Sequence, residues 1–218
     1  MKKIILVLLS AFLVFNLSAQ SKRDIKKQRK LKKAESKNEV ITFNSAEGKF
    51  ASLPIWYEDV RYLLNDIKKD YKVDDKDVHL IIKAAGAAKN NIEGSNPMES
   101  ARKNAWANVR KQFFDSYIEK FTASSTTVGN NTDSRISMEQ SFYKFISVDN
   151  NGVSPLTEIK TYYTYDIGKE TMYCYMAALI RKEEFDKRMK QIRQQEGQYD
   201  RDSRDFFEFM AKQYMEKN

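Results

Sequence analysis

The chain has 218 residues, of which 41% are hydrophobic and 31% are charged, and its formal net charge is +8. This length is enough for one hydrophobic core, and the single cysteine, Cys174, excludes a disulfide framework within the chain. A zinc site built from cysteine and histidine is also excluded, because Cys174 and His79 are the whole supply of these two residue types.

The first 19 residues have the pattern of a secretory signal peptide. Lys2 and Lys3 precede the apolar run Ile4–Phe15, and "NLSAQ" follows as a cleavage region between Ala19 and Gln20. The run is shorter than the roughly 18 to 20 residues that a membrane-spanning helix needs, so an uncleaved anchor is the weaker alternative. We therefore expect an exported protein that begins at Gln20 and is located in a bacterial periplasm or outside the cell.

The positive charge is concentrated in residues 20–40, which are predicted to be a basic linker arm. This arm holds nine Lys or Arg against three acids, whereas the chain from Ile41 onward contains 27 basic and 27 acidic residues. One interpretation is a solvated linker, because Ile25, Leu31 and Val40 are too few to form an apolar face. The other is that the arm binds lipid head groups, lipopolysaccharide phosphates or a peptidoglycan-associated acid by a charge interaction that salt weakens.

The candidate residues for this anionic surface are Lys22, Arg23, Lys26, Lys27, Arg29, Lys30, Lys32 and Lys33. Nucleic acid is not expected as a partner, because the protein is expected to be exported and no aromatic residue lies within the arm to stack on a base.

The next part of the chain predicts a short strand, a helix and a second strand. "VITF" is the short strand. The stretch Leu53–Tyr71 has apolar residues at three- and four-residue steps and Pro54 at its entry, which is typical of an amphipathic helix. Val78–Ala88 is short and begins with β-branched and apolar residues, which indicates a strand.

The helix that follows Asn96 has an apolar stripe with small residues at one end. Asn96 suits the N-cap and Pro97 the first helical position. The stripe begins with Ala101 and Ala105, which let the backbone approach a neighbour closely. Its larger members are Val109, Phe113, Tyr117 and Phe121. We therefore expect this helix to lie at a slant on a twisted sheet, with the larger side chains filling the widening gap.

Three strands and two helices are predicted in the second half. Residues 135–149 carry apolar residues on even positions and favour a strand, with a helix over part of them as the alternative. "LTEIKTYYTY" and "TMYCYMAALI" form a hairpin around "DIGKE". Helical spacing returns after Arg181. The fold class is thus α+β, with an antiparallel sheet of about four strands, amphipathic helices on one face, a domain over residues 41–195 and a C-terminal helix over 196–218.

Aromatic residues on and near the hairpin are the candidate surface for a partner. Strand alternation sends some of them to each face, so those that face the helices are core and the others are free for contact. The alternative is that they pair across strands and only stabilise the sheet. The residues are Trp56, Tyr162, Tyr163, Tyr165, Tyr173 and Tyr175.

Residue sets that would support catalysis are sparse. His79 occupies an alternating position in a strand, where we expect an edge or surface histidine bonded to backbone. The acids of "DDKD" do not match a calcium loop, and no phosphate-binding glycine loop occurs. Cys174, among tyrosines in a strand, is expected to be a buried inert thiol. No cofactor or metal is expected, and a carboxylate-based hydrolase stays open as an alternative.

Several short motifs along Leu53–Lys190 resemble one known family. They are "LPIWYEDV", "AAGAA" around Gly86, the helix through Ala101 and Ala105, and "YCYMAALIRKEEF". These features are similar to the twenty-kilodalton bacterial surface lipoproteins, whose domain is similar to the N-terminal domain of a flagellar T-ring protein. The resemblance implies a helix packed on a curved antiparallel sheet in a non-catalytic envelope protein. The lipid-bearing cysteine of the lipoprotein members is missing here.

We therefore expect an exported, non-enzymatic envelope protein that binds another envelope protein or a cell-wall component. The two alternatives are a periplasmic carboxylate-based hydrolase and tethering to an anionic surface through the basic arm.

Overall fold

The computed structural model describes residues 25–37, 39–71, 77–90, 96–124, 132–147 and 154–215. Within these residues four strands form one sheet in the order β1-β3-β4-β2. The strands are β1 (Ile41–Phe43), β2 (Val78–Lys89), β3 (Leu156–Asp166) and β4 (Thr171–Arg181). The helices are one over residues 25–36, α2 (Ile55–Glu58), α3 (Val60–Tyr71), α4 (Pro97–Ser124), α5 (Thr132–Ile146), α6 (Lys182–Gln194) and α7 (Arg201–Met215). The α+β class is confirmed.

The sheet is built around the hairpin of β3 and β4, which pair antiparallel as predicted. β2 pairs antiparallel with β4, and the three-residue strand β1 pairs parallel with β3, so β2 and β1 are the edge strands. The free edge of β2 is covered by α4, where the side-chain amides of Asn104 and Asn108 each donate a 2.7 Å hydrogen bond to a backbone carbonyl of β2. Covering an edge in this way prevents unwanted strand pairing.

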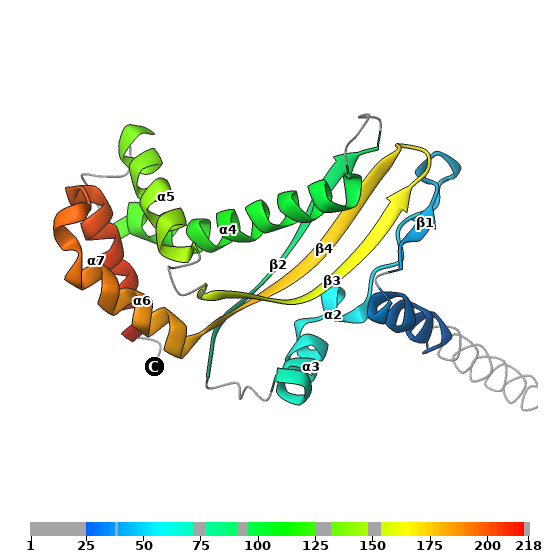
Figure 1. The fold of residues 1–218 in the computed structure, drawn as a ribbon, viewed down its shortest axis with the longest axis horizontal. Coiled ribbons are helices and arrows are strands. Elements are labelled where there is room, and N and C mark those ends of the chain that lie inside the picture. Colours follow the sequence, from blue (N-terminus) through cyan, green and yellow to red (C-terminus); the bar gives the residue numbers. More distant parts are fainter. Residues whose placement is uncertain are drawn as a thin grey trace, which may run out of the picture.

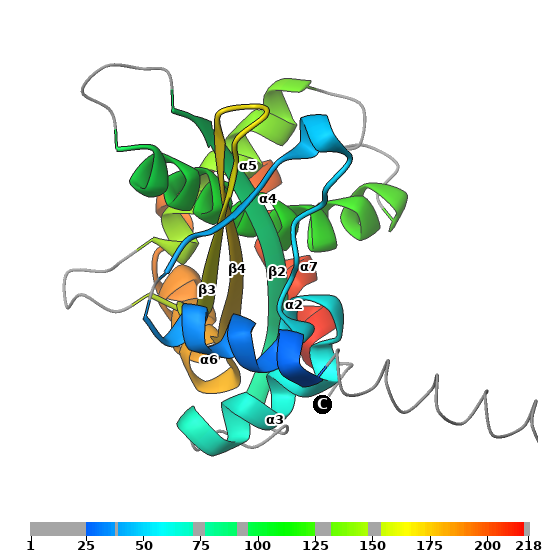
Figure 2. The ribbon, with the colours of Figure 1, turned by 90° about the vertical axis from the view of Figure 1, so that its right-hand side faces the viewer.

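Helices lie on both faces of the sheet, whereas the sequence predicted one face. α4 lies along the first face, α5, α6 and α7 gather beyond one end of the sheet, and the helix over residues 25–36 lies on the second face with α2 and α3 (Figures 1 and 2). Strand alternation explains the two cores. Met176 and Ala178 of β4 belong to the core of the first face, and Ala177 and Leu179 belong to the core of the second.

The predicted close approach of α4 to the sheet is confirmed. Ala101 and Ala105 have no exposed surface, and they face Gly86 in β2. A Cβ atom at Gly86 would lie 2.1 Å from the backbone nitrogen of Ala105 and 2.3 Å from the carbonyl oxygen of Ala101. The small residues of the helix and the glycine of the strand therefore allow backbone to meet backbone.

The C-terminal half of α4 passes beyond the sheet and packs against α5 and α7 (Figure 1). Phe114, Phe142 and Phe206 meet there, with ring centroids of Phe114 5.4 Å from Phe142 and 5.5 Å from Phe206. This aromatic layer makes the terminal helices part of the main core.

The strand predicted over residues 135–149 is wrong, because residues 132–146 form α5. Met138, Phe142, Phe145 and Ile146 are buried, which is the stripe of a helix. The alternation that suggested a strand included Ile136, which is 48% exposed and contributes nothing to the core.

Candidate functional site

Three of the six aromatic residues predicted as a partner surface are buried in the core. Trp56 and Tyr162 are each 1% exposed in the core of the second face, and Tyr163 is 6% exposed in the core of the first. The Tyr162 hydroxyl donates a 3.0 Å hydrogen bond to the backbone carbonyl of Ser52. These three side chains therefore hold the fold together.

The other three aromatic candidates, Tyr165, Tyr173 and Tyr175, are half-buried. Tyr173 and Tyr175 stack with their ring centroids 6.5 Å apart, and Tyr175 also meets the edge of Tyr57 at 5.1 Å. Phe43 of β1 lies against Tyr173 at 6.3 Å. Tyr173 and Tyr175 are neighbours along β4, and Tyr175 also contacts Tyr162 of β3 across the strands, with ring centroids 6.2 Å apart. The rings of Tyr173 and Tyr175 are therefore used in contacts within the fold, which favours the sheet-stabilising alternative.

The basic segment after residue 24 is not a solvated linker where the structure describes it. Residues 25–36 form a helix across the second face of the sheet (Figure 2). Leu31 is 2% exposed and Ala34 is 1% exposed, and Leu31 packs in one cluster with Trp56. The linker was predicted because the segment itself has few apolar residues. Most of the apolar surface in this contact comes instead from α2, α3 and the sheet, which the helix covers.

Polar contacts fix the same helix in place. Glu35 accepts a 3.0 Å hydrogen bond from the indole nitrogen of Trp56, and its other oxygen lies 3.4 Å from the ammonium of Lys160. Lys160 is also paired with Asp66 at 2.7 Å. At the other end, the side-chain oxygen of Gln28 accepts a hydrogen bond from a backbone N–H of α2 at 3.1 Å.

The Lys160 ammonium is stably charged in this environment. Its burial alone would lower the pKa, but the hydrogen bond to Asp66 and the negative charge of Glu35 outweigh the burial, so the pKa of Lys160 is raised. Glu35 is the only carboxylate of the helix over residues 25–36, and it points inward to Lys160 and Trp56.

The charged side chains on the outward surface of the helix are therefore all cationic. Six basic side chains of this helix are exposed: Lys26, Lys27, Arg29, Lys30, Lys32 and Lys33. Within the described part of the chain, none of the six forms an ion pair. We call these six residues the cationic face. Lys22 and Arg23, predicted with them, lie outside the described residues, as do residues 1–19 with the predicted cleavage site.

A groove of about 540 Å³ runs beside the cationic face. Its lining is mainly apolar, and it joins the helix to β1 and to the segment before α2. The lining residues are Lys26, Lys27, Lys30, Leu31, Ile41 and Ser52. Sequence reasoning identified the three lysines but missed Ile41 and Ser52, because no pattern in the sequence connects these two positions to the helix.

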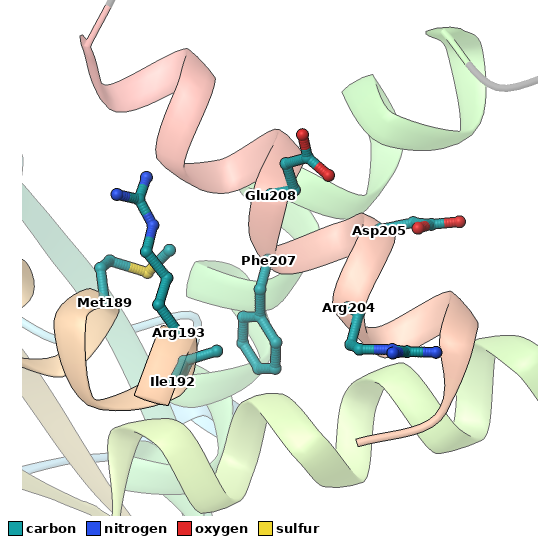
Figure 3. Close-up of a pocket in the computed structure, with 7 residues that line it drawn as sticks. All are labelled: Met189, Ile192, Arg193, Arg204, Asp205, Phe207 and Glu208. Carbon is teal, nitrogen blue, oxygen red and sulfur yellow. The ribbon is translucent and has the colours of Figure 1, made fainter. Parts of the chain in front are cut away.

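A second pocket, of about 420 Å³, lies between α6 and α7 (Figure 3). Its lining residues are Met189, Ile192, Arg193, Arg204, Asp205, Phe207 and Glu208. Asp205 and Glu208 both come from α7 and point in different directions (Figure 3). This pocket therefore does not set two carboxylates against each other across a gap, as the hydrolase alternative requires.

The remaining candidates for chemistry were Cys174 and His79. Cys174 is fully buried as expected, and burial raises the pKa of its thiol to about 12. The side chain of His79 lies outside the described residues. Over the residues that the structure describes, no group of three or more His, Cys, Asp or Glu side chains is arranged to hold a metal ion.

None of the helices in the described ranges combines the length and the apolar character needed to cross a bilayer. Comparison of the chain with profiles of known families, with curated proteins and with solved structures finds no match.

Proposed function

We propose that this chain is an exported, non-enzymatic cell-envelope protein that attaches to an anionic membrane surface through its cationic face. One observation carries the proposal: a helix docked on the sheet exposes six basic side chains that form no ion pair within the described residues, while the acid of this helix, Glu35, points inward. The signal-like N-terminus and the resemblance to envelope lipoproteins support an envelope location.

The arrangement suits a charged surface for two physical reasons. Each basic residue held near an anionic membrane contributes about 1 kcal/mol of binding free energy. The helix is already folded and packed, so binding does not pay the cost of ordering it.

Two exposed apolar residues, one on the helix and one close in sequence to the groove, suit the same surface. Ile25, on the helix itself, is 50% exposed. Phe50, two residues before the groove residue Ser52, is 88% exposed. Apolar side chains beside basic ones are typical of proteins that lie in the membrane interface.

Co-sedimentation with vesicles tests the proposal. The protein is the chain from Gln20 to Asn218, which contains every described residue, and the vesicles are phosphatidylcholine with or without phosphatidylglycerol. We expect binding to the anionic vesicles only, and we expect it to weaken as salt is raised from 0.1 M, where the screening length is about 10 Å, to 1 M, where it is about 3 Å.

Two matched variants locate the surface. The first replaces four exposed lysines of the cationic face by glutamine: Lys26, Lys27, Lys32 and Lys33. The control replaces four exposed lysines elsewhere by glutamine and changes the net charge equally: Lys69, Lys120, Lys190 and Lys212. At about 1 kcal/mol each, the first set weakens binding roughly a thousandfold at low salt. Equal loss in both variants, or vesicle binding that salt does not affect, would contradict the proposal.

A further inference from the structure

We propose that the groove beside the cationic face holds one acyl chain of an anionic lipid, whose phosphate lies at the lysines of the groove. This inference rests on the proposed attachment to an anionic membrane and adds to the cationic face a neighbouring groove that takes up one lipid chain.

The lining of the groove accounts for the tail of this ligand. Three of its six residues are lysines, yet the lining is mainly apolar. The lysines therefore contribute their methylene stems to the wall, while their ammonium groups reach solvent, as long basic side chains commonly do. Leu31 and Ile41 supply the rest of the apolar wall, and Ser52 is the one neutral polar residue.

The charge around the groove accounts for the head group. The lysines of the groove are Lys26, Lys27 and Lys30, and within the described residues none of them is engaged in an ion pair. An uncharged apolar ligand would form no ion pair with these ammonium groups. An anion without a hydrocarbon chain would leave the apolar wall of the groove exposed to water. A ligand with a phosphate and a hydrocarbon chain satisfies both parts of the site.

The size and position of the groove agree with this occupant. A volume of about 540 Å³ lies within the range of roughly 300 to 1,000 Å³ that small-molecule sites span. The groove adjoins the face that we propose to lie on the membrane, so a chain leaving the bilayer has a short path into it. The pocket between α6 and α7 has no such relation to the cationic face (Figure 1).

The test uses a lipid that is soluble as a monomer. Lauroyl-lysophosphatidylglycerol, kept below its micelle concentration, is titrated into the chain from Gln20 to Asn218 in a calorimeter. Lauroyl-lysophosphatidylcholine is titrated in parallel. We expect saturable binding of one anionic lysolipid per chain and at least tenfold weaker binding of the zwitterionic one.

Filling the groove separates this site from the membrane surface. Ser52→Trp adds bulk without charge, and the backbone carbonyl that Tyr162 uses is retained. Ser100→Trp is the control, because Ser100 is also half-buried but lies on α4. We expect Ser52→Trp to weaken lysolipid binding at least tenfold, Ser100→Trp to leave it unchanged, and both to keep vesicle binding within about twofold. If Ser52→Trp does not fold, Ser52→Leu provides the same comparison with a smaller side chain.

The outcomes distinguish this inference from the proposed function. If monomeric lysolipid does not bind saturably, or if Ser52→Trp binds it as well as Ser100→Trp does, the groove is not an acyl-chain site. Persistent salt-sensitive vesicle binding would then leave the proposed function intact. Lysolipid binding without any vesicle binding would support the groove and remove membrane attachment.

Discussion

Replacing Gly86 by alanine tests the contact between α4 and the sheet on which the fold depends. The added Cβ would lie 2.1 Å from the backbone nitrogen of Ala105 and 2.3 Å from the carbonyl oxygen of Ala101, far inside the 3.4 Å at which ordinary contact begins. Both atoms belong to the backbone of a 28-residue helix, so neither can move aside as a flexible side chain would.

The loss of stability expected for Gly86→Ala depends on how far α4 is displaced from the sheet. To relieve the overlap, α4 has to lift from β2, and buried residues along its stripe then lose contact with the sheet. Overpacking usually costs 1 to 3 kcal/mol, and an overlap with backbone belongs at or above the upper end, so we expect a loss of about 3 kcal/mol or more in the free energy of unfolding. For a chain of this size that corresponds to a fall of roughly 6 to 12 °C in Tm.

Gly197→Ala is the matched control, since a Cβ at Gly197 meets nothing within 4 Å. Thermal unfolding followed by circular dichroism compares both variants with the wild type. We expect Gly197→Ala to unfold within about 1 °C to 2 °C of the wild type. A Gly86→Ala protein as stable as this control would show that the strand and the helix are not in backbone contact.

Two further measurements probe the second face and the buried thiol. Lys160→Met leaves the carboxylates of Glu35 and Asp66 unpaired, and we expect it to cost about 2 kcal/mol in urea unfolding. The pKa of Lys160 in the folded state is raised above 10.5, so the stability difference between the wild type and the variant is full below pH 10.5 and shrinks as the pH rises through the folded-state pKa. A stability difference that does not change at alkaline pH would contradict the pairing. Cys174, with its pKa raised to about 12 by burial, is expected to react with a thiol reagent only as fast as the protein unfolds. Rapid labelling of the native protein would place this thiol at the surface.

The elements that the sequence predicted well are those whose local pattern and tertiary role agree. The cap at Asn96 and the alanine-led stripe identified α4 and even its close approach, because only small residues permit that contact. The hairpin of β3 and β4 was predicted equally well, from the alternation of its strands and the turn between them. Residues 135–149 were predicted as a strand because Ile136 completed an alternating pattern from a position that the fold leaves exposed, whereas residues 132–146 form a helix.

The sequence by itself determined the α+β class, the concentration of positive charge before residue 41, the burial of Cys174 and the packing of Ala101 and Ala105 on a sheet, since each depends on local composition or spacing. Only the tertiary structure decided that the basic segment is a docked helix and that Trp56, Tyr162 and Tyr163 are core. Both depend on partners distant in the chain. Leu31 alone does not give the segment an apolar face that could be recognised in the sequence. In the fold, Leu31 packs against Trp56 and the sheet, and Lys160 pairs with the inward carboxylate of Glu35, so the helix is held in place.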